Sequence, residues 1–209
     1  MAIKNMKKIK KSKIKKTRKI KNTKKTKKDK IRQSLPLNIN IESLVLLESR
    51  HIFLYEVINS VSSKKVCKEL IALDELSHEP IVLVLNSPGG SVTDGFAIID
   101  TMRTIKSPVV TLVTGAACSM AALISITGYQ RVMSANAYWM GHEMVCGGVD
   151  YYEKNRARNK FYEVLWARLI EHLKKFTKLS LDDLERLRRG ELWLSATEAK
   201  QKGVTDHIM

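Results

Sequence analysis

The sequence lacks the features that mark membrane, secreted and metal-binding proteins. No run of 18 apolar residues occurs in its 209 residues, which predicts that the chain does not span a membrane. The N-terminal segment lacks the apolar stretch of a signal peptide, so we expect no secretory signal. The cysteines, Cys67, Cys118 and Cys146, form no CxxC pair, which favours a reducing, cytoplasmic location and argues against zinc. The histidines show no metal-ligand spacing, and we predict no metal.

Acidic residues are almost absent from the first 33 positions. This segment holds 17 Lys or Arg against one acid, Asp29, so 20 of the chain's 37 basic and 20 of its 21 acidic residues lie beyond it. The whole net charge of +16 therefore belongs to the N-terminus, and residues 34–209 are neutral. Dense like charge with little apolar surface predicts a disordered basic tail over residues 1–34. The domain that follows shows no electrostatic bias toward phosphate.

Several functions fit the basic tail, and the sequence leaves them open. It could tether the protein to nucleic acid or another anionic surface, because Lys-rich segments attract such surfaces. It could be a nuclear-type address or an organelle transit peptide, although Lys outnumbers Arg and serines are few. A solvated arm that only keeps the protein soluble fits equally well.

Beyond the tail, apolar runs of strand length alternate with helical patterns. Strand, helix, strand is a crossover pattern, which favours a largely parallel sheet. We therefore predict an α/β fold over residues 35–209, a mostly parallel sheet with crossover helices and a long helix in the C-terminal half. Strands are expected at about 51–55, 81–85, 108–114 and 131–133, with the segment 137–142 after them. Helices are expected at 62–76, after the turn at 86–95, from Ser119, at 151–176, at 181–189 and from Ser195.

Two of these helices have a predicted cap, and an apolar face is predicted for the first helix and for the long one. Ser62 or Ser63 is expected to cap the helix that ends near Leu76, and Ser195 with Glu198 forms a capping box for the last helix. The apolar face of the first helix is Val66, Leu70, Ile71 and Leu73, and that of the long helix is Tyr152, Phe161, Val164, Leu165, Leu169 and Leu173.

The stretch Gly115–Ala122 joins the third strand to an apolar helix and contains a lone serine, Ser119. A serine at such a junction can present its hydroxyl near the positive end of the helix dipole, which favours a developing anion. Small residues around a serine are also what a tightly packed turn needs, so this stretch alone does not decide between chemistry and packing.

Two further features are expected at the same edge of the sheet. The pair Gly89-Gly90 follows the second strand, and His142 ends the segment after the fourth. Open α/β sheets place their sites where the strands end. Ser119 as nucleophile, His142 as base and the backbone amides of Gly90 and Met120 as oxyanion donors would supply what acyl transfer needs, apart from an acid that orients the base. A lone histidine at a strand end is more often structural, and its pairing with a serine is what favours chemistry.

At this point the sequence resembles the ClpP proteolytic subunit over about four fifths of its length, from Val45 onward. Several motifs occur in the family's order: 46–54 (LLESRHIFL), 85–95 (LNSPGGSVTDG), 100–102 (DTM), 105–109 (IKSPV), 115–120 (GAACSM) and 194–199 (LSATEA) with Gly203, Val204 and Asp206. The resemblance implies the ClpP/crotonase-like fold, serine endopeptidase activity on unfolded polypeptides, and two stacked seven-membered rings that enclose the sites. It also implies a separate AAA+ unfoldase that uses ATP, with no cofactor in this chain.

Carried over by motif, the nucleophile is Ser119, the base is His142 and the oxyanion amides are those of Gly90 and Met120. The family's acid is an Asp two residues before the aromatic of the final Phe/Tyr-x-Ser segment. Here the aromatic is Trp193, and Glu191 stands at the acid's position. Glutamate fills this role in some α/β-hydrolases. Its extra methylene displaces the carboxylate by about 1.5 Å, so the backbone must compensate.

Other departures are Cys118 for Ala, Ala121 for Gly, Glu143-Met144 for Gln-Pro, and the Lys-rich tail in place of the family's short N-terminal segment. They indicate a divergent member, of which a viral or phage peptidase that processes capsid proteins would be one example.

Two alternative functions stay open. The Asp-to-Glu change would suit an inactive scaffold subunit that assembles with active partners, although such a subunit needs neither Ser119 nor His142. A crotonase-type acyl-CoA enzyme shares the fold, but no Ser–His pair in this order is expected there.

Overall fold

The computed structural model describes residues 48–145 and 151–209, which all lie in one unit, Leu46–Met209. The predicted basic tail, Cys146 and the glycine pair at 147–148 lie outside the described residues. Within the described ranges, no helix combines the length and the apolar character that crossing a membrane requires.

The centre of the unit is a parallel sheet. Its path runs β1 (His51–Leu54), β2 (Ile81–Ser87), β3 (Val109–Cys118), β4 (Gln130–Met133) and β7 (His207–Ile208), and every neighbouring pair is parallel. Leu83 and Leu85 on β2 are fully buried, as expected for a strand covered by other elements. The predicted α/β class and parallel sheet are confirmed, with β7 as an additional short strand that the sequence reading missed.

Strand β3 is longer than predicted, and its length determines where the site forms. The expected strand ended at Thr114, but β3 continues to Cys118, the residue before Ser119. The first half of β3 pairs with β4, and Ala116–Cys118 pair with β5 (Tyr138–His142). Because β3 pairs first with β4 and then, near its end, with β5, the end of β5 lies beside Ser119.

Strand β6 (Glu191–Ser195) was not predicted, and it lies antiparallel to β5. Its sequence, Glu-Leu-Trp-Leu-Ser, alternates polar or exposed residues with buried leucines, Leu192 and Leu194. This alternation is the usual mark of a half-buried strand and could have identified it. What no local pattern supplies is the register, which sets Glu191 opposite His142.

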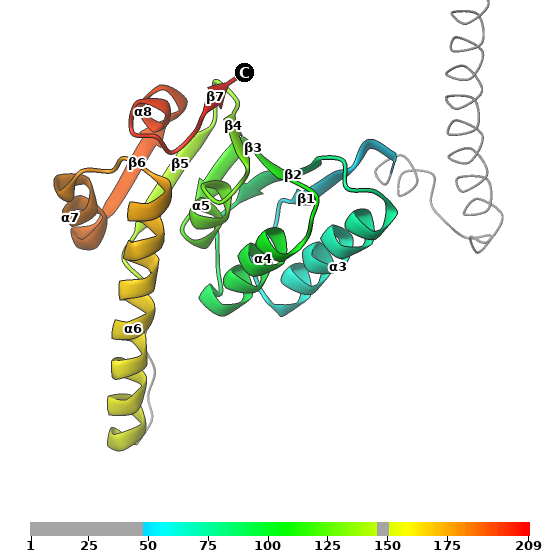
Figure 1. The fold of residues 1–209 in the computed structure, drawn as a ribbon. Helices are drawn as coiled ribbons and strands as arrows, with labels where there is room; N and C mark the ends of the chain where they lie inside the picture. Colours follow the sequence, from blue (N-terminus) through cyan, green and yellow to red (C-terminus); the bar gives the residue numbers. More distant parts are fainter. Residues whose placement is uncertain (1–47, 146–150) are drawn as a thin grey trace, which may run out of the picture. The chain divides into compact units, whose positions relative to one another are not determined.

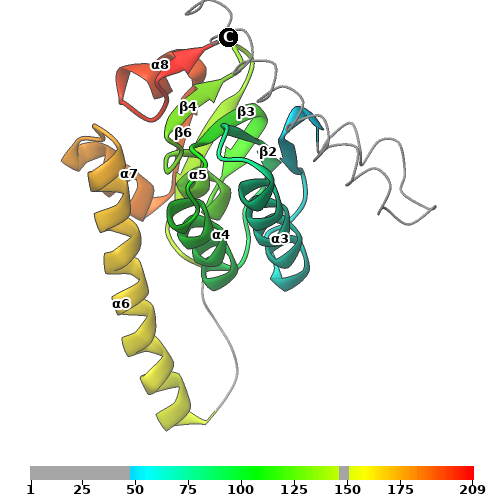
Figure 2. The same cartoon turned by 45° about the vertical axis from the view of Figure 1, so that its right-hand side comes forward.

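The helices α3 (Ser60–Leu76) and α4 (Val92–Thr104) pack side by side next to α5 (Met120–Ser125), as Figures 1 and 2 show. The predicted cap of α3 was wrong. Asn59 is the N-cap: its side chain accepts from the amides of Val61 and Ser62, and the Ser62 hydroxyl accepts from the Asn59 amide. Ile71 was also misplaced on the apolar face, since 51% of it is exposed, whereas the other three predicted positions are buried.

The C-terminal half contributes α6 (Tyr152–Phe176), α7 (Leu181–Arg189) and α8 (Ala196–Gln201), in agreement with the predicted helices. The Ser195–Glu198 capping box is confirmed. The expected apolar face of α6 is only half right: Leu165, Leu169 and Leu173 are buried, but Tyr152, Phe161 and Val164 are more than half exposed. Figures 1 and 2 show the reason, because the N-terminal half of α6 projects beyond the sheet.

Candidate active site

Ser119 occupies a sharp turn between β3 and α5. Its φ of 54° and ψ of −121° place a non-glycine residue in a conformation that costs free energy and that clusters at functional sites. The Ser119 amide donates to the Met140 carbonyl at 2.8 Å, which ties the turn to β5. A serine exposed on a strained strand-to-helix turn is the arrangement of nucleophiles in α/β-hydrolases.

The helix behind Ser119 supplies one backbone donor. Met120 is the first residue of α5, so its amide has no acceptor within the helix. Trp139, fully buried on β5, donates its indole N–H to the Ala122 carbonyl at 3.2 Å. This bond fixes α5 against the strand that ends in His142.

The Gly89-Gly90 turn supplies a second donor. Ile58 clamps the turn by donating to the Gly89 carbonyl and accepting from the Ser91 amide, both at 2.8 Å. The Gly89 amide donates to Ser87 Oγ at 3.2 Å. These hydrogen bonds involve Gly89 and Ser91, on either side of Gly90, and none of them uses the Gly90 amide.

Only glycine fits at both positions of this turn. Gly89 has a φ of 89°, and a Cβ there would lie 2.7 Å from Ser119 Cβ and 2.9 Å from the Met120 amide nitrogen. Gly90 has a φ of 147°, and a Cβ there would lie 2.2 Å from the Ile58 carbonyl oxygen. The missing side chains let the turn approach the Ser119 turn closely.

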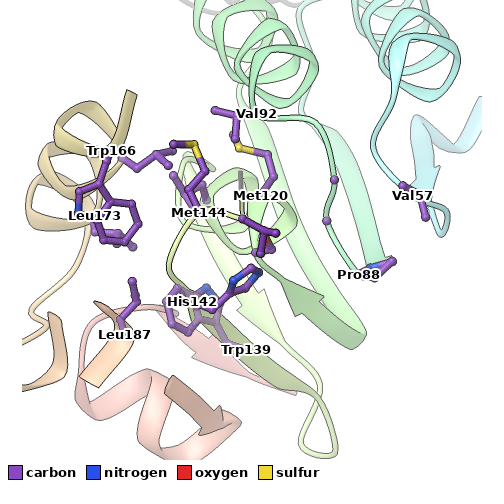
Figure 3. Close-up of a pocket in the computed structure, with 17 residues that line it drawn as sticks. Val57, Pro88, Val92, Met120, Trp139, His142, Met144, Trp166, Leu173 and Leu187 are labelled. Atoms are coloured by element: carbon purple, nitrogen blue, oxygen red, sulfur yellow. The ribbon is translucent and has the colours of Figure 1, made fainter. Parts of the chain in front are cut away.

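Ser119, His142, Gly90 and Met120 all line one pocket of about 370 Å³ (Figure 3). Its remaining wall is largely apolar and includes Leu123, Trp139, Trp166, Leu169, Leu173 and Leu187. The structure thus brings together the four residues that the sequence predicted as nucleophile, base and oxyanion donors. An apolar pocket beside a nucleophile is suited to hold an apolar side chain next to the bond that reacts.

The apolar wall itself was not predicted as part of the site. Trp166, Leu169 and Leu173 come from α6, and Figure 3 shows Trp166 and Leu173 across the pocket from Pro88. The helical spacing of Leu169 and Leu173 indicated a buried face. It could not indicate that this face borders a pocket rather than a closed core.

Glu191 lies beside the pocket rather than in its lining. The β5–β6 register pairs it directly with His142, and cross-strand neighbours have Cβ atoms about 4.5–5.5 Å apart. Its Oε2 accepts from the Trp193 indole N–H at 2.7 Å. Burial, with a smaller contribution from the charge of Glu191, raises the pKa of the Cys118 thiol. Cys118 therefore stays protonated at neutral pH and does not compete with Ser119 as a nucleophile.

Over the described residues, no hydrogen bond or ion pair joins Ser119, His142 and Glu191 to one another. The three residues adjoin one edge of the sheet, at the ends of β3 and β5 and the start of β6. Catalytic hydrogen bonds are often long in the absence of substrate and tighten when it binds, so this geometry is compatible with a triad.

No three His, Cys, Asp or Glu side chains gather to hold a metal ion within residues 48–145 and 151–209. Independence from metals and cofactors remains a prediction from the sequence.

Comparison with known proteins identifies the family that this chain resembles. The sequence model of the Clp protease family matches residues 37–209. "ATP-dependent Clp protease proteolytic subunit 1" of Chlamydia muridarum (strain MoPn / Nigg) is 35% identical over 175 residues, covering 78% of this chain and 88% of the relative. The subunit 1 of Protochlamydia amoebophila (strain UWE25) is 32% identical over 188 residues, covering 87% and 91%. "ATP-dependent Clp protease proteolytic subunit 2" of Prochlorococcus marinus (strain MIT 9313) is 34% identical over 158 residues, covering 74% and 78%.

Proposed function

The chain belongs to the Clp protease family of serine peptidases, and from that premise we propose that Ser119, His142 and Glu191 form its catalytic triad. One observation carries the proposal: Ser119, His142, Gly90 and Met120 line the same pocket. The cross-strand pairing of Glu191 with His142 supplies the acid. The substrate is an unfolded polypeptide, and the reaction is hydrolysis of its peptide bonds.

The first half of the reaction forms an acyl-enzyme. Ser119 Oγ attacks the scissile carbonyl carbon while His142 takes the hydroxyl proton. The carbonyl oxygen becomes an oxyanion that accepts from the Gly90 and Met120 amides. His142 then gives its proton to the leaving amine as the C–N bond breaks, and Ser119 keeps the acyl group as an ester.

The second half returns the enzyme to its starting state. A water molecule gives a proton to His142 and attacks the ester carbon, and the oxyanion forms again in the same place. Collapse of that intermediate breaks the bond to Ser119 Oγ, which recovers its proton from His142. Glu191 holds the imidazole in orientation throughout and stabilises its charged form.

The pocket also supports a preference for apolar side chains on the acyl side of the cleaved bond. Leu123, Leu169 and Leu173 border the space next to Ser119, and burying an apolar side chain there gains about 25 cal/mol per Å². A charged side chain would lose its hydration without a partner.

A fluorophosphonate probe tests the nucleophile. The purified protein should be labelled, and Ser119→Ala should abolish labelling. Ser60→Ala, which changes an exposed serine at the start of α3, is the matched control and should label normally. An assembled protein that the probe leaves unlabelled would contradict the proposal and indicate an inactive subunit. Turnover of an acyl-CoA thioester without labelling would indicate crotonase-type chemistry.

We further propose that the chain assembles into two stacked heptameric rings served by an AAA+ unfoldase in the cytoplasm. The relatives' name, proteolytic subunit of an ATP-dependent protease, supports an ATP-driven partner. The exposed apolar residues of α6, among them Tyr152 and Val164, support burial in an assembly. Negative-stain images of the purified protein test the ring, and a monomer at high concentration would contradict it.

Binding of the basic tail to nucleic acid is a separate proposal. Its test is salt-dependent DNA binding, which should vanish when residues 1–33 are deleted. Unchanged binding by the deleted protein would contradict a role for the tail.

A further inference from the structure

The Glu191 carboxylate has a hydrogen-bond partner on its own strand. Trp193 Nε1 donates to Glu191 Oε2 at 2.7 Å. Residues two apart on a strand share a face, and here the buried leucines 192 and 194 point the other way. The bond therefore lies on the side of β6 that the leucines leave free.

The same face carries the base. The register sets Glu191 opposite His142 and Trp193 opposite Met140, so these four side chains form two neighbouring cross-strand pairs. Met140 in turn pairs with Cys118, the residue before Ser119. Trp193 is thus linked to the site in two ways: by its hydrogen bond to Glu191, which lies opposite His142, and by its pairing with Met140, which lies beside Cys118.

The chemistry of the two groups is complementary. An ionised carboxylate only accepts hydrogen bonds and an indole N–H only donates them. The bond occupies Oε2 and leaves Oε1 to accept from an imidazole N–H. Hydrogen bonds to a charged acceptor are stronger than those between neutral groups, so this bond favours one orientation of the flexible Glu191 side chain.

Glutamate needs such a constraint more than aspartate would. It has one more rotatable bond between backbone and carboxylate, and Glu191 is exposed, so packing does not immobilise it. A triad acid must be held within about 0.5 Å of its productive position. A fixed donor on the same strand supplies that constraint.

We propose that Trp193 is a positioning residue, whose indole N–H holds the Glu191 carboxylate in place to orient His142. The inference rests on the proposed function, because it takes Glu191 as the triad acid. It assigns to the aromatic residue of β6 a polar role that packing would not require.

Four proteins test the inference: the wild type, Trp193→Phe, Glu191→Asp and the double variant. Phenylalanine keeps an aromatic ring and removes the donor. The readouts are kcat and KM for a fluorogenic peptide and the acylation rate with a fluorophosphonate, which stays measurable when turnover is slow. Trp193→Phe should lower kcat and the acylation rate about tenfold and leave KM within about twofold.

The Asp background separates positioning from packing. A shorter carboxylate cannot keep the 2.7 Å bond to the indole without moving, so Trp193→Phe should change the acylation rate less than about twofold there. Tyr138→Phe, which removes a hydroxyl from an exposed aromatic of β5, is the matched control and should leave kcat unchanged. The melting temperature of each Phe variant should stay within about 2 °C of wild type.

Two outcomes would overturn the inference. Equal losses from Trp193→Phe in the Glu and Asp backgrounds would mean that the ring only packs. An unchanged or higher kcat for Trp193→Phe would mean that the bond does not help catalysis. Neither outcome touches the proposed function, which fails separately if Ser119 is not labelled or if removing the Glu191 charge has little effect.

Discussion

Two polar clusters of this protein use their hydrogen-bonding groups in opposite ways. In the cluster of Arg131 and Asp206, the guanidinium donates to both carboxylate oxygens and to the carbonyls of Phe176 and Gly203, and the Arg131 amide donates to Asp206 as well. In the candidate active site, Ser119 and His142 line an open pocket and share no hydrogen bond with Glu191.

The difference reflects what each cluster must do. The bonds of Arg131 join β4 to the end of α6 and to the segment before β7, so the cluster stabilises the fold by leaving few donors unpaired. The proposed active site must leave groups available to bind a substrate and an oxyanion, and its candidate nucleophile, Ser119, has a strained backbone conformation. Substitutions in the two clusters should therefore separate activity from stability.

The largest expected effect comes from changing Glu191, the proposed acid. Glu191→Gln keeps the shape and the capacity to accept from Trp193 but loses the charge that stabilises a protonated His142. We expect kcat to fall by about 10⁴, or about 5.5 kcal/mol of transition-state stabilisation, at unchanged folding stability. Glu143→Gln, next to the base in sequence, is the control and should retain activity. A loss below about tenfold in peptide hydrolysis would show that Glu191 is not the orienting acid.

The second effect is on the oxyanion donors. In Gly89→Ala the new Cβ meets the Cys118 carbonyl oxygen at 2.5 Å, at a φ of 89° that side chains rarely adopt. The turn must shift and carry the Gly90 amide with it, so kcat should fall by about 10²–10³. Gly190→Ala is the control, because an added Cβ there would meet no described atom within 4 Å apart from those of its chain neighbours. Unchanged kcat in steady-state assays of Gly89→Ala would argue against the Gly90 donor.

The third effect is on folding stability rather than on activity, the opposite of the first two. Arg131→Met removes the guanidinium, so Asp206 keeps only the bond from the Arg131 amide and the carbonyls of Phe176 and Gly203 lose their donor. The free energy of unfolding should fall by about 2–3 kcal/mol. Arg188→Met breaks only a 4.0 Å pair with Glu185 on the surface and should cost less than about 0.5 kcal/mol. Urea unfolding measures both. A tenfold drop in the probe-labelling rate of folded Arg131→Met would contradict the separation.

The smallest effect is a pH dependence of stability. Burial lowers the pKa of His172. The His172 ring forms a 2.8 Å hydrogen bond with Thr127 and packs against Phe96 and Phe176. The charged groups that act on the ring are Arg103, Lys175 and Asp100. Above its ordinary value of 6.5 the imidazole is neutral in both states. Below that pH the unfolded chain takes up a proton that the folded chain resists, so stability falls as the pH falls.

Comparing urea midpoints above and below that pH measures the effect. His172→Gln should flatten the dependence, whereas His207→Gln, which alters an exposed histidine, should leave it as in wild type. A dependence that is equally steep in wild type and His172→Gln would contradict the assignment to His172.

Local patterns determined much of this protein. Apolar runs and helical spacing predicted the order of strands and helices, and the glycine pair and Ser119 marked the turns at which the site forms. These signals are local because backbone conformation and burial depend on near neighbours in sequence. One error of these patterns was also local. The N-cap of α3 is Asn59 and not Ser62 or Ser63 as predicted, because Ser62 is the N3 residue of the same capping box.

The tertiary structure decided how these pieces meet. Only the second pairing of β3 brings β5 to Ser119, and only the antiparallel register of β5 with β6 sets Glu191 opposite His142. Register depends on contacts between segments that are far apart in the chain, so no local pattern specifies it. The sequence by itself thus determined the candidate nucleophile, base, acid and oxyanion donors. The tertiary structure determined that Glu191 lies opposite His142, with Trp193 as its hydrogen-bond partner, because strand register depends on distant contacts.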